Sequence, residues 1–109
     1  MIRFEILEGV ARITLDRAEK KNALTPAMLE ELATVAGDEH ALKPARSILV
    51  MGEGDAFCAG FDLTLCRDDE RAMADLLTGL SRAMRALRRA AQPVVLCAHG
   101  AAIAGGCAL

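Results

Sequence analysis

Two short glycine-containing segments carry the residues best suited to hold a negatively charged atom. One is Phe57-Cys58-Ala59-Gly60-Phe61-Asp62-Leu63, and the other extends from Gly100 to Gly106. Their small residues, which would let the main chain come close to a ligand, are Ala59, Gly60, Gly105 and Gly106. A helix beginning near Gly105 would also point unpaired N–H groups and the positive end of its dipole at the ligand. The pattern predicts an anion hole, although for any single glycine pair a tight turn is the simpler interpretation.

Other reactive side chains lie near these segments, and each also has a structural interpretation. Asp62 could act as a base, but acidic side chains in turns commonly accept bonds from nearby backbone N–H groups, so we expect it to hold its loop in shape. Cys58 and Cys107 have no evident activating base and are expected to be small packing residues. His99 could be a general base or a structural residue at a strand end. Phosphate-binding loops are excluded, because the sequence has neither Gly-Lys-Ser/Thr nor GxGxxG.

The elements that must position these segments alternate between strands and helices. Alternating apolar residues predict a β-hairpin, whereas apolar residues at helical spacing after the Thr25-Pro26 cap predict an amphipathic helix. The expected elements are strands at 2–7 and 11–15, a helix from Pro26 to Gly37, a strand at 47–51, a helical region from about 68 to before Pro93, and a strand at 94–98. This order predicts an α/β fold with right-handed crossovers.

The last two strands are short apolar runs, SILVM at 47–51 and VVLCA at 94–98, which are typical of strands buried on both faces. The glycine-containing segments follow these strands directly. Since ligands bind at the carboxyl ends of strands in α/β sheets, the two segments could face one site. We also expect exposed apolar surface or dependence on further chain, because too few helices are present to cover both faces.

The composition is that of a globular protein with a core, since 53% of the 109 residues are hydrophobic and 26% are charged. A net charge of −2 gives no overall basic field, which argues against nucleic acid or an anionic membrane as the main partner. No apolar run is long enough to cross a membrane. The four cysteines are irregularly spaced and the two histidines lie far apart, so we expect reduced thiols, a cytoplasmic location and no metal site.

Several segments, taken in order, match the signatures of one known family. They are Leu15-Asp16-Arg17-Ala18-Glu19-Lys20-Lys21-Asn22-Ala23-Leu24, then Phe57 to Leu63, Pro93-Val94-Val95 and, after Gly100, Gly105-Gly106-Cys107-Ala108-Leu109. Each segment alone is a weak signal, but the ordered set is specific and covers essentially the whole chain. The chain therefore resembles the N-terminal portion of an enoyl-CoA hydratase/isomerase (crotonase) family enzyme, and residues 1–109 would form the N-terminal part of one crotonase-like domain.

The resemblance implies a fold, a ligand and a site. The implied fold is α/β, a spiral of ββα units that would be incomplete at the C-terminus. The implied ligand is an acyl-CoA thioester. Coenzyme A would be part of the substrate, and no separate cofactor is expected. The thioester oxygen would accept bonds from the backbone N–H groups of Ala59 and Gly105, which stabilise an enolate. The other implied substrate-binding residues are Lys21, Asn22, Ala23, Leu24, Gly60, Phe61 and Asp62. Lys20 or Lys21 would lie near the CoA phosphates, or simply in a solvated turn. The complete protein would be a homotrimer or a dimer of trimers.

The sequence also departs from the family pattern. Hydratases of this family use two glutamates, and the resemblance places the first at Ala108 and the second beyond Leu109. We therefore expect isomerase-like or other single-base chemistry rather than hydration. The rival hypothesis is a non-catalytic acyl-CoA binder or a truncated remnant, and the apolar C-terminal residues favour truncation.

Overall fold

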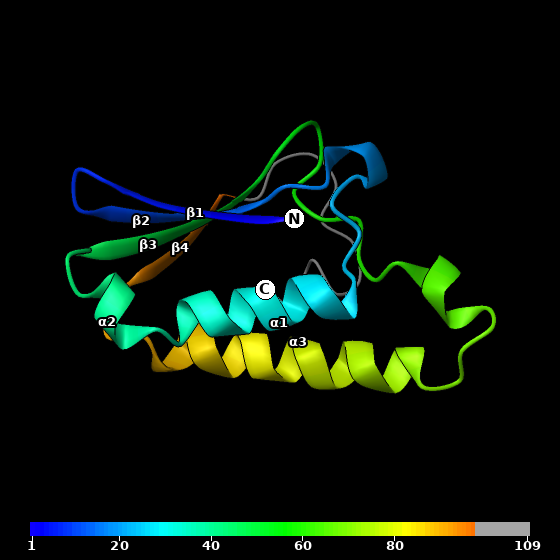
Figure 1. Ribbon diagram of the computed structural model, residues 1–109. Helices are drawn as coiled ribbons and strands as arrows, with labels where there is room; N and C mark the ends of the chain where they lie inside the picture. The colour runs from blue at the N-terminus through cyan, green and yellow to red at the C-terminus, as the bar shows by residue number, and fades with distance from the viewer. Residues whose placement is uncertain (98–109) are drawn as a thin grey trace.

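The computed structural model describes residues 1–97, which form a four-stranded sheet with two long helices on one of its faces (Figure 1). The elements are β1 (Ile2–Leu7), β2 (Val10–Leu15), η1 (Ala18–Lys20), α1 (Pro26–Ala36), α2 (Glu39–Leu42), β3 (Ser47–Gly52), η2 (Leu63–Cys66), α3 (Ala72–Arg89) and β4 (Val94–Cys97). The strand order is β1-β2-β3-β4, with β1 antiparallel to β2 and the remaining neighbours parallel. This arrangement confirms the predicted α/β fold.

The first two strands form the hairpin that the alternating pattern predicted. Phe4 pairs with Ile13, and Glu5 pairs with Arg12. Because successive side chains point to opposite faces, Ile13 lies in the core whereas Arg12 lies on the other side of the sheet and is exposed. The burial pattern of the hairpin therefore fixes which face of the sheet the helices cover.

Helix α1 begins and ends where the sequence predicted. The Thr25 hydroxyl accepts a bond from the Met28 amide at 3.1 Å, and Pro26 occupies the first turn. Met28, Leu29 and Leu32 are fully buried, and α1 packs along α3 as well as against the sheet. The short helix α2 and the 3₁₀ segments η1 and η2 were not predicted, since elements of three or four residues carry no periodic signal.

Within residues 1–97 the last two strands are covered on one face only, although their apolar runs are typical of strands buried on both faces. On β3, Ile48 and Val50 are buried, but Leu49 is only partly covered. On β4, Val95 is 54% exposed. The reason is that α1 and α3 lie on the same face of the sheet, so that within residues 1–97 the opposite face has no helix over it (Figure 1). The expectation of exposed apolar surface is consistent with this arrangement.

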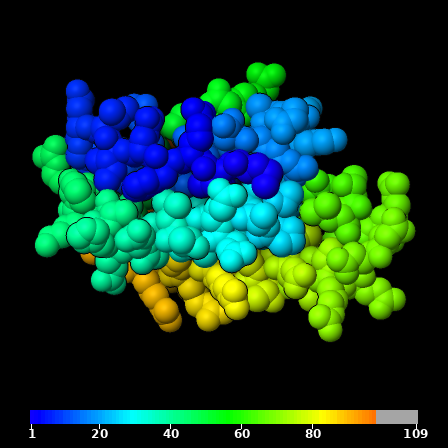
Figure 2. Space-filling model, viewed as in Figure 1, coloured from blue at the N-terminus to red at the C-terminus, as the bar shows by residue number. Residues whose placement is uncertain are grey.

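The segment between Asp62 and α3 projects from one end of the molecule, at the right of Figures 1 and 2. Leu63 is 63% exposed and Leu65 is 39% exposed, although both are apolar. Within residues 1–97, no helix is long and apolar enough to span a membrane, and no cluster of His, Cys, Asp or Glu side chains could hold a metal ion.

Candidate functional site

The connection between β2 and α1 is a tightly bonded loop, which we call the platform loop (residues 17–24). The Arg17 carbonyl accepts bonds from the amides of Lys20 at 3.0 Å and Asn22 at 2.9 Å. Lys21 and Asn22 both have left-handed backbone angles, with φ of 52° and 57°. Two successive left-handed residues reverse the chain sharply, so that the loop folds back on its own start before α1 begins.

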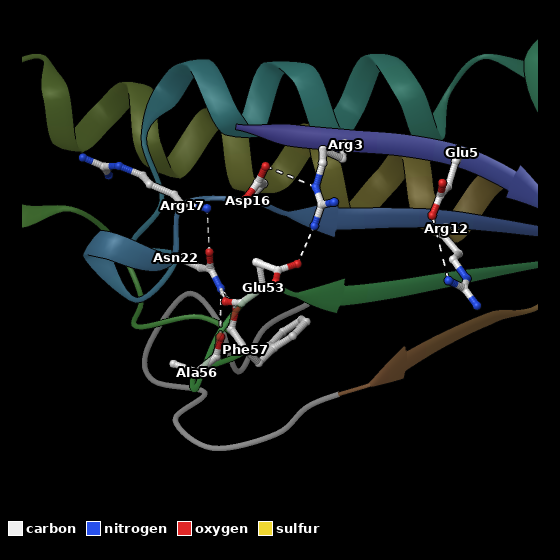
Figure 3. A network of polar contacts seen from close by, with 9 residues as sticks. All are labelled: Arg3, Glu5, Arg12, Asp16, Arg17, Asn22, Glu53, Ala56 and Phe57. Atoms are coloured by element: carbon white, nitrogen blue, oxygen red, sulfur yellow. Dashed lines mark hydrogen bonds and ion pairs between the residues drawn. The ribbon is translucent and has the colours of Figure 1, made fainter.

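The Asn22 side chain fastens the platform loop to the segment after β3 (Figure 3). It is fully buried, and its Oδ1 accepts a bond from the Arg17 amide at 2.8 Å. Its Nδ2 donates to the carbonyls of Glu53 at 2.9 Å, Ala56 at 2.8 Å and Phe57 at 3.2 Å. One carboxamide therefore joins two loops that are more than thirty residues apart in the sequence.

The platform loop also bonds, through its backbone, to the segment that we call the donor loop (residues 57–62). Leu24 forms a parallel bridge with Phe61: its amide donates to the Gly60 carbonyl at 2.7 Å, and its carbonyl accepts from the Asp62 amide at 2.8 Å. The Ala59 amide donates to the Lys21 carbonyl at 3.0 Å. The path of the donor loop is thus set by bonds on both sides of its glycine.

Four successive amides of the donor loop can be accounted for one by one. The Ala59 amide bonds to the Lys21 carbonyl, the Gly60 amide to the Cys58 sulfur at 3.4 Å, and the Asp62 amide to the Leu24 carbonyl. The Phe61 amide has no hydrogen-bond partner among residues 1–97. The bridge explains this difference, because in an extended segment the groups of alternate residues point to opposite sides.

These contacts argue against Ala59 as the oxyanion donor that the resemblance implied. Its amide already bonds to the Lys21 carbonyl and would have to give up that bond to reach a ligand. Gly60 has a φ of 92°, a conformation that side-chain-bearing residues rarely adopt, and this turn presents the next amide, that of Phe61, on the other side of the loop. The second predicted donor, Gly105, lies outside the described residues.

In the segment predicted to bind substrate, residues 21–24, the structure exposes two residues at least in part and buries the other two. Lys21 is exposed and Ala23 is partly exposed, so both can face a ligand. Asn22 and Leu24 are fully buried, so neither presents an exposed surface that could line the predicted channel. Any additional chain could only increase their burial, so their contribution is to hold the loops rather than to touch a ligand.

Asp62 lies at the end of the donor loop and is only 7% exposed. One oxygen accepts bonds from the Thr64 amide at 3.2 Å and the Thr64 hydroxyl at 2.5 Å, and the other forms an ion pair with Arg17 at 2.9 Å. The Thr64 hydroxyl and, after it, the Arg17 guanidinium lower the pKa of Asp62 below its usual 3.8, against the opposing effect of burial. The carboxylate is therefore ionised and engaged in holding its loop, as the sequence led us to expect.

Arg17 is the residue that sequence reasoning missed at this site. The same Nη1 that pairs with Asp62 donates to the Ala23 carbonyl at 2.9 Å. The guanidinium thus ties the end of the donor loop to the platform loop. No local signal could have found this role, because the two partners are forty-five residues apart in the sequence.

Replacing Asp62 by Asn is expected to lower the free energy of unfolding by about 1.5–3 kcal/mol at neutral pH, the usual value of hydrogen bonds to a charged group. Because the folded-state pKa of Asp62 is lowered, its contribution is present above the usual 3.8 and is lost as the pH falls through the lowered value. Urea titrations should therefore give wild type a larger free energy of unfolding than Asp62→Asn at neutral pH, and this difference should disappear in acid. Asp16→Asn is the control, because Asp16 pairs with Arg3 at an exposed position and should change stability by less than about 1 kcal/mol. If wild type were more stable than Asp62→Asn by the same amount at pH 2.5 and at pH 7, the ionised Asp62 carboxylate would not be the group that holds the loop.

A separate groove lies at the other end of α1. It has a volume of about 840 Å³ and lies between α1, α2 and α3, where Arg82, Arg85 and Arg89 contribute to its wall. None of its lining residues belongs to the platform loop or the donor loop. The groove is therefore distinct from the cluster of bonds that orients the Phe61 amide.

Comparisons with known proteins agree with the fold. The family model described as enoyl-CoA hydratase/isomerase matches residues 5–109. A relative in Mycobacterium bovis, named probable enoyl-CoA hydratase echA6, is 37% identical over 97% of this chain, and a probable enoyl-CoA hydratase of Rhodobacter capsulatus is 53% identical over 57% of it. The chain spans 42% of the length of the first relative and 23% of the second.

Solved structures show the same similarity. An enoyl-CoA hydratase from Mycobacterium smegmatis superimposes with a TM-score of 0.88 at 33% identity, covering 97% of this chain and 42% of that one. The human enoyl coenzyme A hydratase domain-containing protein 3 gives a TM-score of 0.88 at 27% identity, covering 97% and 43%. The chain belongs to the enoyl-CoA hydratase/isomerase family.

Proposed function

We propose that this chain supplies the thioester-holding part of an enzyme that acts on an acyl-CoA. The Phe61 amide, in place of the Ala59 amide, would donate to the thioester carbonyl oxygen, and the Gly105 amide would be the second donor. The observation that carries the proposal is that, of the amides at 59–62, the Phe61 amide has no partner within residues 1–97. Two fixed donors at that oxygen would stabilise the negative charge of an enolate.

The surroundings of the Phe61 amide support this role. Bonds to Leu24 hold the backbone on both sides of Phe61, so its amide need not reorganise when charge develops on a ligand. Gly60 carries no side chain that would block the approach of a carbonyl oxygen. The exposed lysines at positions 20 and 21 lie on the neighbouring loop and would attract the CoA phosphates. Coenzyme A would enter as part of the substrate.

The reaction we propose is double-bond isomerisation or another single-base reaction. In isomerisation, one base removes a proton from the α-carbon of a 3-enoyl thioester, and the proton returns at the γ-carbon. Hydration additionally needs a group to activate water, and Ala108 cannot move a proton. Asp62 does not supply the base in this proposal, because its oxygens are bonded to Thr64 and Arg17. The complete protein would act as a homotrimer or a dimer of trimers.

The protein that contains this chain is therefore expected to convert a 3-enoyl-CoA into the 2-enoyl-CoA and to hydrate crotonyl-CoA only weakly. Parallel assays of the two reactions, together with calorimetric titration by butyryl-CoA, measure this directly. A positioned acid or base contributes about 100- to 10,000-fold, so Ala108→Glu should raise hydration by about tenfold or more, with Ala108→Gln as the matched control.

The possible outcomes separate the hypotheses. Binding of butyryl-CoA without turnover of either substrate would support the non-catalytic binder instead. Hydration by the unmodified protein as fast as isomerisation would contradict the single-base reaction. A protein that binds no CoA thioester would show that the proposal is wrong as a whole.

A further inference from the structure

We propose that Asn22 is a positioning residue, which sets the direction of the Phe61 amide through the platform loop. The inference rests on the proposed function in that Phe61 is taken as the donor to the thioester oxygen. Asn22 itself is fully buried and lies too deep to touch a ligand. Its effect on the reaction would therefore be transmitted by the backbone that it fixes.

The orientation of the Asn22 carboxamide is determined by its four partners. Its oxygen faces the Arg17 amide, and its nitrogen faces the carbonyls of Glu53, Ala56 and Phe57. With the oxygen and nitrogen exchanged, an acceptor would face three acceptors and a donor would face a donor. Only one orientation satisfies these groups, so the side chain acts as a fixed strut between the loops.

The strut adjoins the backbone bonds that shape the donor loop. Lys21, immediately before Asn22, accepts the bond from the Ala59 amide, and Leu24, two residues after it, forms both bonds that flank Phe61. On the other side, the Phe57 carbonyl that Asn22 holds lies only two residues before Ala59. Loss of the Asn22 side-chain bonds would free the platform loop and the start of the donor loop together. The direction of the Phe61 amide would then change with them.

The residue type matters as much as the position. At a φ of 57°, Asn is among the few residues besides glycine that adopt the left-handed conformation readily. Aspartate has the same size and a similar backbone tolerance, but it would place a charged oxygen against three carbonyls. Asn22→Asp therefore changes the strut while leaving its volume unchanged, and Asn22→Gly removes the strut while keeping the backbone angle accessible.

The test uses the full-length protein with an aryl-enoyl-CoA thioester, whose absorption moves to longer wavelength when its carbonyl oxygen is polarised. We expect Asn22→Asp and Asn22→Gly to lower kcat about 100-fold, the effect of a misplacement of about 1 Å, with little change in KM, and to abolish the spectral shift of the bound thioester. The matched control is Leu32→Ala, which removes a fully buried side chain from α1, outside both loops. It should lower stability but leave kcat per folded molecule and the spectral shift unchanged.

A folded Asn22→Asp protein with wild-type kcat and spectral shift would overturn the inference, as would equal losses of kcat in Asn22→Asp and Leu32→Ala. Failure of the proposed function is recognised separately, because wild type would then give no spectral shift at all. In that case amide NMR decides: the positioning role requires the Ala59, Phe61 and Asp62 resonances to move in the Asn22 variants and to stay in place in Leu32→Ala. Unmoved resonances in the Asn22 variants would contradict the role.

Discussion

An ester in place of the Phe61 amide is expected to lower kcat of the full-length protein about 100- to 1,000-fold, the usual effect of removing one oxyanion-hole donor. The change, made by incorporating phenyllactic acid at position 61, removes the N–H group and keeps the side chain. KM should change little, because negative charge on the thioester oxygen develops only as the enolate forms. Steady-state kinetics with a 3-enoyl-CoA measure both constants.

The matched control is the corresponding ester at Ala59. There the lost N–H group bonds to the Lys21 carbonyl, so the expected result is a loss of stability of about 1 kcal/mol with a much smaller change in kcat. Both esters lie in the donor loop, two residues apart, and each removes one N–H group. If the Ala59 ester abolished turnover and the Phe61 ester did not, the donor would be Ala59 after all.

Gly52→Ala is expected to destabilise the fold by about 3 kcal/mol, at the upper end of the usual cost of overpacking. A Cβ atom at this position would lie 2.5 Å from the Phe57 carbonyl oxygen and 2.9 Å from the Asn22 Nδ2. Neither atom can withdraw easily, because one belongs to the backbone and the other is fixed by three carbonyls. Urea denaturation followed by circular dichroism measures the loss.

Gly79→Ala provides the comparison for this substitution. A Cβ atom at this position in α3 would lie 3.0 Å from the Leu29 Cβ, a tight contact, but alanine also favours a helix by about 1 kcal/mol relative to glycine. The net change should therefore be much smaller than for Gly52→Ala. Equal losses for the two variants would show that the approach of the two loops does not restrict position 52.

Sequence periodicity was sufficient to predict the elements that have a regular apolar pattern. The hairpin, α1, β3 and α3 each carry such a pattern or a recognisable cap. They lie close to where the sequence placed them, although α3 begins at Ala72 rather than near residue 68. Periodicity could not tell how many helices cover each face of the sheet. The exposure of Val95 depends on α1 and α3 sharing one face, which is a property of the whole arrangement.

At the candidate site, the sequence could not show which amides of the donor loop are already hydrogen-bonded. Ala59 and Phe61 are both plausible donors from the residue pattern alone. The difference between them arises from the bonds with Lys21 and Leu24, which lie some thirty-seven residues earlier in the chain. The burial of Asn22 and Leu24 likewise results from contacts with residues that are distant in the sequence. Contacts of such long range leave no local sequence signal, so only coordinates could assign them.

Asp62 lies at the boundary between two segments. The conformation of the segment before it must be kept for the site, whereas the sequence of the segment after it can change. Up to Asp62, the chain is held by backbone bonds to Leu24 and by the bonds of the Asp62 carboxylate to Thr64 and Arg17. Immediately after it, residues 63–71 project from one end, and all of them except Cys66 are exposed (Figure 2). Insertions or exchanges in residues 65–71, which leave Thr64 in place, would cost little stability and leave the Phe61 amide where it is. A single scaffold of this kind can therefore be fitted to new ligands without redesign of its chemistry.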